Sequence, residues 1–193
     1  MNTVSLSYNK DVISSKHVTA VIGVTFFVLA TSLGAYVRIP VPGSPVPITL
    51  QTFFVLLSGA VLGRRLGSVS QLGYILLGAI GLPVFQGAGV GMSYLAGPTG
   101  GYIVGFMVAA WTVGSLARSE NISMARLIAV FTAGSLIIYA FGTAWLVYLY
   151  RIDIAHALSV GVLPFIPADV AKVSLAALLF SKIASRSKAL FSA

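Results

Sequence analysis

The sequence predicts an all-α integral membrane protein with six transmembrane helices. Hydrophobic residues make up 58% of the 193 residues and charged residues only 8%, whereas a soluble domain has roughly 25% charged residues. A helix needs about 20 mostly apolar residues to cross the hydrocarbon core of a bilayer. Stretches without Asp, Glu, Lys or Arg are long enough at 17–37, 39–63, 66–117 and 127–150.

The longest uncharged tract has room for two helices and a loop, and one further apolar segment, from about 158 to 181, contains Asp169 and Lys172. We therefore expect helices at approximately 17–37, 46–63, 66–85, 98–117, 124–149 and 165–184. All of 1–193 is predicted to form a single transmembrane domain. It would begin with a short polar segment at 1–16 and end with a short basic tail at 182–193.

The distribution of basic residues predicts the orientation of these helices. With a cytoplasmic N-terminus, the outer loops contain only Arg38 and Arg151, and nine basic residues are cytoplasmic: Lys10, Lys16, Arg64, Arg65, Arg118, Arg126, Lys182, Arg186 and Lys188. This bias follows the positive-inside rule and places both termini in the cytoplasm of a multi-pass cell-membrane protein. The net charge of +8 then reflects orientation and contact with anionic lipid, and not nucleic-acid binding.

The chain lacks the residues that several chemical functions need. The chain has no cysteine, which excludes disulfides, thiolate catalysis and Cys-ligated metal. It has no H-E-x-x-H motif, and His156 has no second ligand nearby in its predicted outer loop. It also has no nucleotide-binding loop. We expect a protein that is not an enzyme, holds no cofactor or metal, and relies on partners for any use of ATP.

Three prolines, Pro47, Pro98 and Pro167, stand at predicted helix starts that face outward. Proline is favoured in the first turn of a helix, where its missing N–H would have had no partner. Helix N-termini attract anions and polar oxygens, so three of them at one face, including the one at Thr99, would form a polar cup. The alternative is that each is an ordinary helix start.

Asp169 and Lys172 are the most informative residues in the chain. A charged side chain at mid-bilayer costs roughly 2.5 to 3.5 kcal/mol, so it normally faces the protein interior or a water-filled cavity. Residues three apart share one face of a helix. The pair could be an internal ion pair that neutralises itself, or it could bind a small polar ligand near the outer surface, and we favour the ligand.

Four segments, in order along about residues 30 to 180, carry a resemblance to a known family: "PGSPVPITLQTFFVLLSGAVLGRRLG", "LLGAIGLPVF", "GPTGGYIVGF" and "PFIPADVAK". In these segments the chain resembles the BioY family, the biotin-specific substrate-binding (S) component of energy-coupling factor transporters. The resemblance implies an S-component-like six-helix bundle. It also implies high-affinity biotin capture at the extracellular face and uptake driven by partner ATPases.

The resemblance implies roles for individual residues when the chemistry of biotin is considered. Asp169 would accept a hydrogen bond from a ureido N–H. Lys172 would either donate to the ureido carbonyl or pair with the biotin carboxylate, and these two roles remain open. In the first case the carboxylate would bind the backbone N–H groups near Thr99.

The glycine-rich loop at 86–101 is the natural lid, because its six glycines allow tight turns and close approach to a ligand. Gln86 offers an amide, Tyr94 and Tyr102 offer flat faces with hydroxyl tips, and Phe85 could pack on the thiophane ring. Taken singly, each aromatic is better explained as plain packing or as an interfacial anchor. Gln51 is a second amide candidate that could instead bond a neighbouring helix.

The resemblance also implies partners: a transmembrane coupling subunit and two cytoplasmic ATPases. Ala30 and Gly34 lie on one face of the first predicted helix, where the coupling subunit could dock; the alternative is packing within the bundle. The competing function is a stand-alone secondary transporter of a small polar or anionic vitamin, coupled through Asp169. It is disfavoured because no second intramembrane carboxylate and no inverted repeat are evident.

Overall fold

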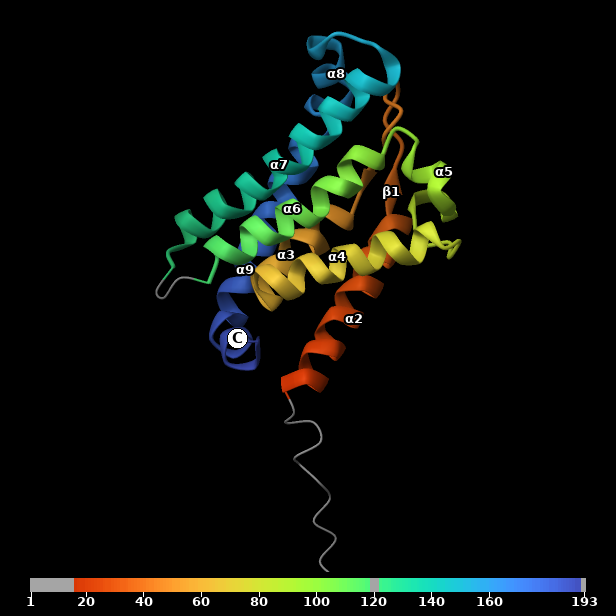
Figure 1. Cartoon of the computed structure of the whole chain (residues 1–193). Helices are drawn as coiled ribbons and strands as arrows, with labels where there is room; N and C mark the ends of the chain where they lie inside the picture. The colour runs from red at the N-terminus through yellow and green to blue at the C-terminus, as the bar shows by residue number, and fades with distance from the viewer. Residues whose placement is uncertain (1–15, 119–121, 192–193) are drawn as a thin grey trace, which may run out of the picture.

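The computed structural model describes residues 16–118 and 122–191, so most of the expected polar segment at 1–16 lies outside the described residues. The fold is a helical bundle (Figure 1). Its main helices are α2 (Lys16–Tyr36), α3 (Gln51–Leu62), α4 (Arg64–Ala79), α6 (Gly100–Leu116), α7 (Met124–Tyr150) and α9 (Ile166–Phe191).

Short elements fill the connections at one end of the bundle. They are the antiparallel strands β1 (Arg38–Ile39) and β2 (Ile48–Thr49), the 3₁₀ helices η1 (Gln86–Ala88) and η2 (Leu163–Phe165), and the helices α5 (Gly91–Leu95) and α8 (Ile154–Gly161). The long outer loops predicted from sequence are therefore structured. Asp153 explains the start of α8, because its side chain accepts a hydrogen bond from the His156 N–H at 2.9 Å.

Three helical segments of the described chain are long and apolar enough to cross a membrane: Lys16–Tyr36, Met124–Tyr150 and the run Ile154–Phe191. Helices α3 and α6 are apolar but shorter. Large hydrophobic side chains are also exposed along the outside of the bundle, for example Phe26, Leu33 and Leu136. An exterior of this kind is expected where lipid is the solvent, and together with the apolar spans it indicates a multi-pass membrane protein.

Several predicted boundaries are wrong. The second helix begins at Gln51 and not near 46, because Pro47 precedes strand β2. The third ends at Ala79 and not at 85, since Gly81 adopts a φ of 104° that leaves the helix. The last helix continues to Phe191 and not 184, so much of the expected basic tail is helical.

The prediction that three helices begin with a proline and together form a polar cup is also wrong. Only Pro167 lies inside a first turn, as the second residue of α9. Pro98 precedes α6, whose N-terminal flanking residue is Thr99, and Pro47 stands before a strand.

Helices α6 and α7 pack side by side and share the most extensive contact in the bundle (Figure 1). Gly101 makes this possible, because a Cβ there would collide with the Cβ of Trp145. Helix α3 crosses α6 just as closely, since Gly59 lies against the carbonyl oxygen of Ala110. Two clusters of buried hydrophobic residues result. One surrounds Phe131 and Phe180, and the other lies nearer α8.

Ala30 and Gly34 are buried inside the bundle and not on its surface. A Cβ on Gly34 would stand 3.1 Å from the Gln51 nitrogen and 3.0 Å from the Phe54 ring. The Gly34 carbonyl also accepts a hydrogen bond from the Leu50 N–H at 3.1 Å. Gly34 therefore serves the alternative role, close packing of α2 on α3, and Ala30 is buried as well, so neither residue presents an exposed surface for docking.

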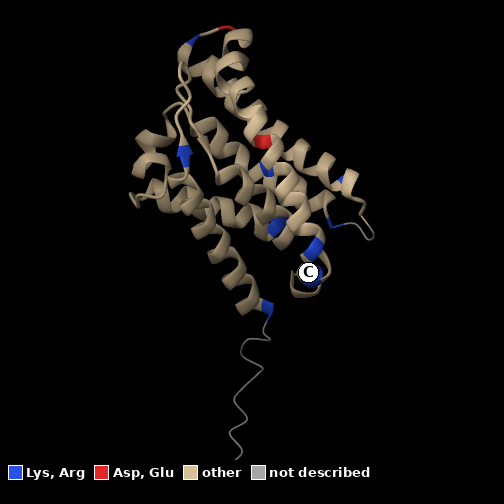
Figure 2. Ribbon diagram, turned by 180° about the vertical axis from the view of Figure 1, so that it is seen from behind, with Lys and Arg blue, Asp and Glu red and all other residues tan. Residues whose placement is uncertain are grey.

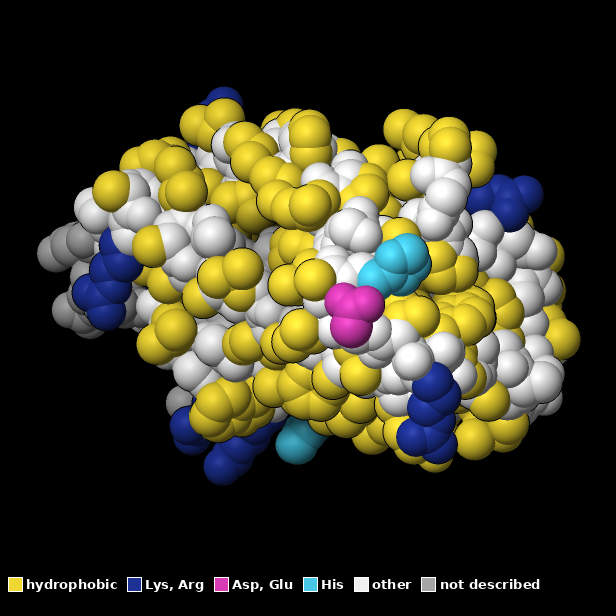
Figure 3. Space-filling model, turned by 90° about the horizontal axis from the view of Figure 1, so that it is seen from above, with side chains coloured by type: hydrophobic (Ala, Val, Ile, Leu, Met, Phe, Trp, Pro, Cys, Tyr) yellow, Lys and Arg dark blue, Asp and Glu magenta, His cyan; other side chains and the backbone are white. Residues whose placement is uncertain are grey.

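The first and last helices meet at the end of the bundle opposite α8 (Figure 1). Their contact is direct, because a Cβ on Gly23 of α2 would clash with the Phe191 ring of α9. Most Lys and Arg residues of the described chain gather at this end (Figure 2). The α8 end shows a largely hydrophobic surface with one acidic side chain beside one histidine (Figure 3).

Candidate ligand-binding site

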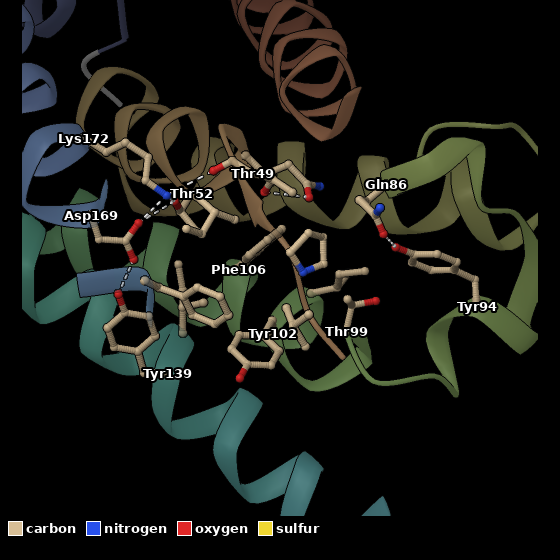
Figure 4. Close-up of a pocket in the computed structure, with 17 residues that line it drawn as sticks. Thr49, Thr52, Gln86, Tyr94, Thr99, Tyr102, Phe106, Tyr139, Asp169 and Lys172 are labelled. Carbon is tan, nitrogen blue, oxygen red and sulfur yellow. Dashed lines mark hydrogen bonds and ion pairs between the residues drawn. The ribbon is translucent and has the colours of Figure 1, made fainter. Parts of the chain in front are cut away.

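A cavity lies between the start of α3, the start of α6, the middle of α7 and the start of α9, beside strand β2 and the η1–α5 loop (Figure 4). Most of the predicted site residues line it: Gln51, Gln86, Tyr94, Thr99, Tyr102, Asp169 and Lys172. Residues from four separate sequence regions thus converge on one hollow.

The charged pair lies at one end of this cavity. The Lys172 ammonium forms an ion pair with Oδ1 of Asp169, and it donates hydrogen bonds to the Thr49 carbonyl oxygen at 3.0 Å and the Thr52 hydroxyl at 2.7 Å. The internal ion pair considered as the alternative therefore exists. It is nevertheless not sealed away, because both residues line the cavity.

Tyr139 of α7 completes the charged group, since its hydroxyl donates a hydrogen bond to Oδ2 of Asp169 (Figure 4). Sequence reasoning missed Tyr139, and it also missed Thr49 and Thr52. The available signal was a phenol in the middle of a largely apolar helix, where a buried O–H must find a partner. Asp169 is only 6% exposed, so these contacts hold its carboxylate in one orientation.

Gln86 and Tyr94 face the cavity from the loop between α4 and α6. The Tyr94 hydroxyl donates to Oε1 of Gln86 at 3.1 Å, which leaves the Gln86 amide nitrogen as a donor for other groups. Burial raises the pKa of Tyr94, so its hydroxyl stays protonated at neutral pH.

Phe85 does not line the cavity. It is fully buried and its ring stacks on Tyr94, with the ring centroids 4.9 Å apart and the planes at 14°. It also contacts the Tyr74 ring of α4 in a T-shaped arrangement. The predicted direct contact with a ligand is thus replaced by a supporting one, in which Phe85 holds the Tyr94 ring in place.

Gln51 bonds a neighbouring helix, which is the alternative considered for it, and it also lines the cavity. Its contact with a ligand stays a prediction. Its amide nitrogen donates to the Tyr74 hydroxyl at 2.5 Å, and its Oε1 accepts from the Thr49 hydroxyl at 3.2 Å. Tyr102 presents its ring to the cavity, because its hydroxyl is turned away to the Gly161 carbonyl at 2.8 Å.

The middle of the cavity is apolar, with side chains of Ile103, Phe106, Ile138 and Phe165. The arrangement therefore suits a ligand with an apolar body that offers hydrogen-bonding groups at its ends. Its volume is about 50 Å³. Within the described residues no group of three His, Cys, Asp or Glu side chains could hold a metal ion.

Comparison with known proteins identifies the relatives of this chain. The BioY family matches residues 6–189. A biotin transporter BioY from Thermotoga maritima is 46% identical over 147 residues, which are 76% of this chain and 85% of the relative. A probable biotin transporter BioY from Pyrococcus horikoshii is 41% identical over 160 residues, 83% of this chain and 93% of the relative.

A solved structure is similar over nearly the same extent. It is the crystal structure of the S-component for biotin from an ECF-type ABC transporter. It superposes with a TM-score of 0.80 at 27% sequence identity, covering 88% of this chain and 92% of the other.

Proposed function

The chain belongs to the BioY family, and from this premise we propose that it captures biotin at the outer face of the cell membrane as the substrate-binding subunit of an energy-coupling factor transporter. The observation that carries the proposal is the Asp169–Lys172–Tyr139 group at one end of a cavity whose middle is apolar. Biotin has a polar ureido ring, an apolar thiophane ring and chain, and a terminal carboxylate, in that order.

Asp169 is the first contact for the ureido ring. Its carboxylate has about four acceptor positions, and those not used by Lys172, Tyr139 and Thr52 can accept a ureido N–H. Lys172 has three donors, and the contacts to Asp169, Thr49 and Thr52 match all three. Donation to the ureido carbonyl therefore requires Lys172 to exchange one of these partners.

The opposite end of the cavity then receives the biotin carboxylate. Gln86 can donate through its amide nitrogen, and Thr99 stands beside the N-terminus of α6, where the helix dipole favours an anion. Gln51 and Tyr102 complete the wall, and Phe85 acts through Tyr94. Biotin itself is the transported ligand, and no cofactor takes part.

The loop at 86–101 is proposed to move when the ligand binds. A cavity of about 50 Å³ has room for only a few water molecules, so a bicyclic vitamin needs more space. Gly87 and Gly91 adopt positive φ angles of 72° and 80°, which glycine reaches without strain. They are the natural points about which the loop would open.

We propose that α2, α3, α4, α6, α7 and α9 cross the membrane with both termini in the cytoplasm. The meeting of α2 and α9 at the basic end of the bundle supports this topology, because an even number of crossings returns the chain to its starting side. Energy for uptake would come from two cytoplasmic ATPases through a transmembrane coupling subunit, since the chain has no nucleotide-binding loop.

Calorimetric titration of the purified chain with biotin tests the proposal. Wild-type protein should bind without ATP or other subunits, and Asp169→Asn should weaken binding about a hundredfold, because a charge-assisted hydrogen bond is lost. Asp153→Asn is the matched control, as Asp153 is exposed at the tip of α8. Absence of binding to the wild type, or equal affinities for the two variants, would refute the assignment.

A further inference from the structure

A second hollow lies at the basic end of the bundle, away from the ligand-binding cavity. Four helix ends form it: the end of α3, the start of α4, the end of α6 and the end of α9. It is an open groove of about 680 Å³. Its walls are made by Leu62, Gly63, Arg64, Arg65, Leu66, Gly114, Ser115, Arg118, Lys188 and Phe191.

The groove combines positive charge with apolar surface. Three guanidinium groups, of Arg64, Arg65 and Arg118, line it together with the Lys188 side chain. The side-chain carboxylates of the described chain belong to Asp153 and Asp169, and neither of them lines this groove.

Arg118 is held in position by backbone groups. Its Nη1 donates to the Val61 carbonyl at 3.4 Å and its Nη2 to the Lys188 carbonyl at 3.4 Å. The guanidinium lies over Gly63, where a Cβ would come within 2.7 Å of Nη1. A half-buried, planar guanidinium fixed in this way suits a phosphate group, which guanidinium recognises through paired hydrogen bonds.

The start of α4 adds to the positive electrostatic potential of the groove. Arg64 is the first residue of this helix, so the unpaired N–H groups of its first turn lie beside the arginine side chains. Gly114 of α6 lies directly against this turn, since a Cβ there would collide with the Arg64 nitrogen. The close packing of backbone brings Arg118, just beyond the end of α6, next to Arg64.

The apolar lining decides which phosphate-bearing molecule fits. Leu62, Leu66 and Phe191 line the groove beside the basic groups. A free phosphate ion would gain nothing from them, whereas a phospholipid places an acyl chain directly next to its phosphate. Basic pockets between transmembrane helices at the cytoplasmic surface are suited to anionic headgroups. We infer that this groove binds the headgroup and upper acyl chain of an anionic phospholipid.

Native mass spectrometry of the full chain with equimolar phosphatidylglycerol and phosphatidylcholine tests this site. Wild-type protein should retain phosphatidylglycerol preferentially, and the double variant R64Q/R118Q should lose about tenfold of that preference. The control is R126Q/R186Q, which removes two exposed arginines that do not line the groove. Equal retention of the two lipids by wild type, or equal losses in the two double variants, would overturn the inference.

Two further measurements distinguish a lipid site from a site for free anions and from a folding defect. Excess inorganic phosphate should leave the lipid preference intact; its disappearance would show a site for free anions and overturn the lipid assignment. The melting temperature of R64Q/R118Q should stay close to that of wild type, which shows that the variant is folded. Because the lipid measurement needs no biotin, it stands or falls independently of the proposed transport function.

Discussion

Tyr139 shows how one side chain prepares the site for its ligand. Its hydroxyl donates to Asp169 from a different helix, while Lys172 approaches the same carboxylate from the next turn of α9. A carboxylate held from two sides loses little further freedom when a ligand binds. Tyr139 therefore acts by positioning Asp169, in addition to lining the cavity.

Tyr139→Phe should weaken biotin binding about tenfold, because one hydrogen bond to a charged group is lost while the ring remains. Calorimetry measures the effect, and Tyr148→Phe is the matched control, since Tyr148 is an exposed tyrosine of the same helix. The further substitution Asp169→Asn should cost less in the Phe background than in the wild type. Fully additive losses would show that Tyr139 does not act through Asp169.

At the residue scale, sequence reasoning located the charged pair, and most of the residues it predicted for the site line the cavity. The residues that it missed or misplaced have identifiable physical reasons. Asp169 and Lys172 stand out because charge is costly in an apolar helix. Thr49 contributes a backbone carbonyl, which every residue has, so no pattern could single it out. Phe85 was misplaced because an aromatic beside a glycine-rich loop is equally suited to contact a ligand or to support a neighbour.

At the scale of elements, the sequence predicted the approximate positions of the six main helices but not all of their ends. Charge-free tracts define where a helix can be buried, and these matched α2, α6 and α7 closely. The residues at which a helix begins and ends depend instead on local backbone conformation and hydrogen bonding. Residues 39–50, before α3, carry no charge, yet part of this segment forms the β1–β2 hairpin, in which Ile48 and Thr49 pair with Ile39 and Arg38.

A substitution at Gly34 tests the packing of α2 against α3. Gly34→Val should lower the melting temperature by about 3 to 10 °C, because the added side chain overpacks a close contact with the Gln51 backbone. It should also weaken biotin binding, since the start of α3 carries Gln51 and Thr52 into the cavity. Thermal unfolding and calorimetry measure the two effects.

The control for this prediction is Leu29→Val, an apolar change on the exposed face of the same helix. It should leave melting temperature and affinity near the wild-type values. If Gly34→Val also left both unchanged, while reducing co-purification with the coupling subunit, the residue would serve docking and not internal packing.

At the scale of the whole molecule, the cavity and the lipid groove lie toward opposite ends of one bundle. The cavity uses the starts of α3, α6 and α9, and the groove uses the ends of the same three helices. Any tilt of these helices would therefore move both sites together. Helices α3 and α9 also pack directly on one another.

The opposite placement of the two ends also makes the topology testable in cells. The natural chain has no cysteine, so a single introduced thiol reports the side of the membrane without background labelling. Ser159 is exposed on α8, and Ser185 is exposed near the end of α9.

With α8 outside and both termini in the cytoplasm, Ser159→Cys should react with a membrane-impermeant maleimide in intact cells. Ser185→Cys should react only after permeabilisation, because the maleimide cannot reach the cytoplasm. The reverse pattern would invert the orientation and place the cavity on the cytoplasmic side, whereas labelling of both cysteines in intact cells would contradict a crossing of the membrane by α9 between the two positions.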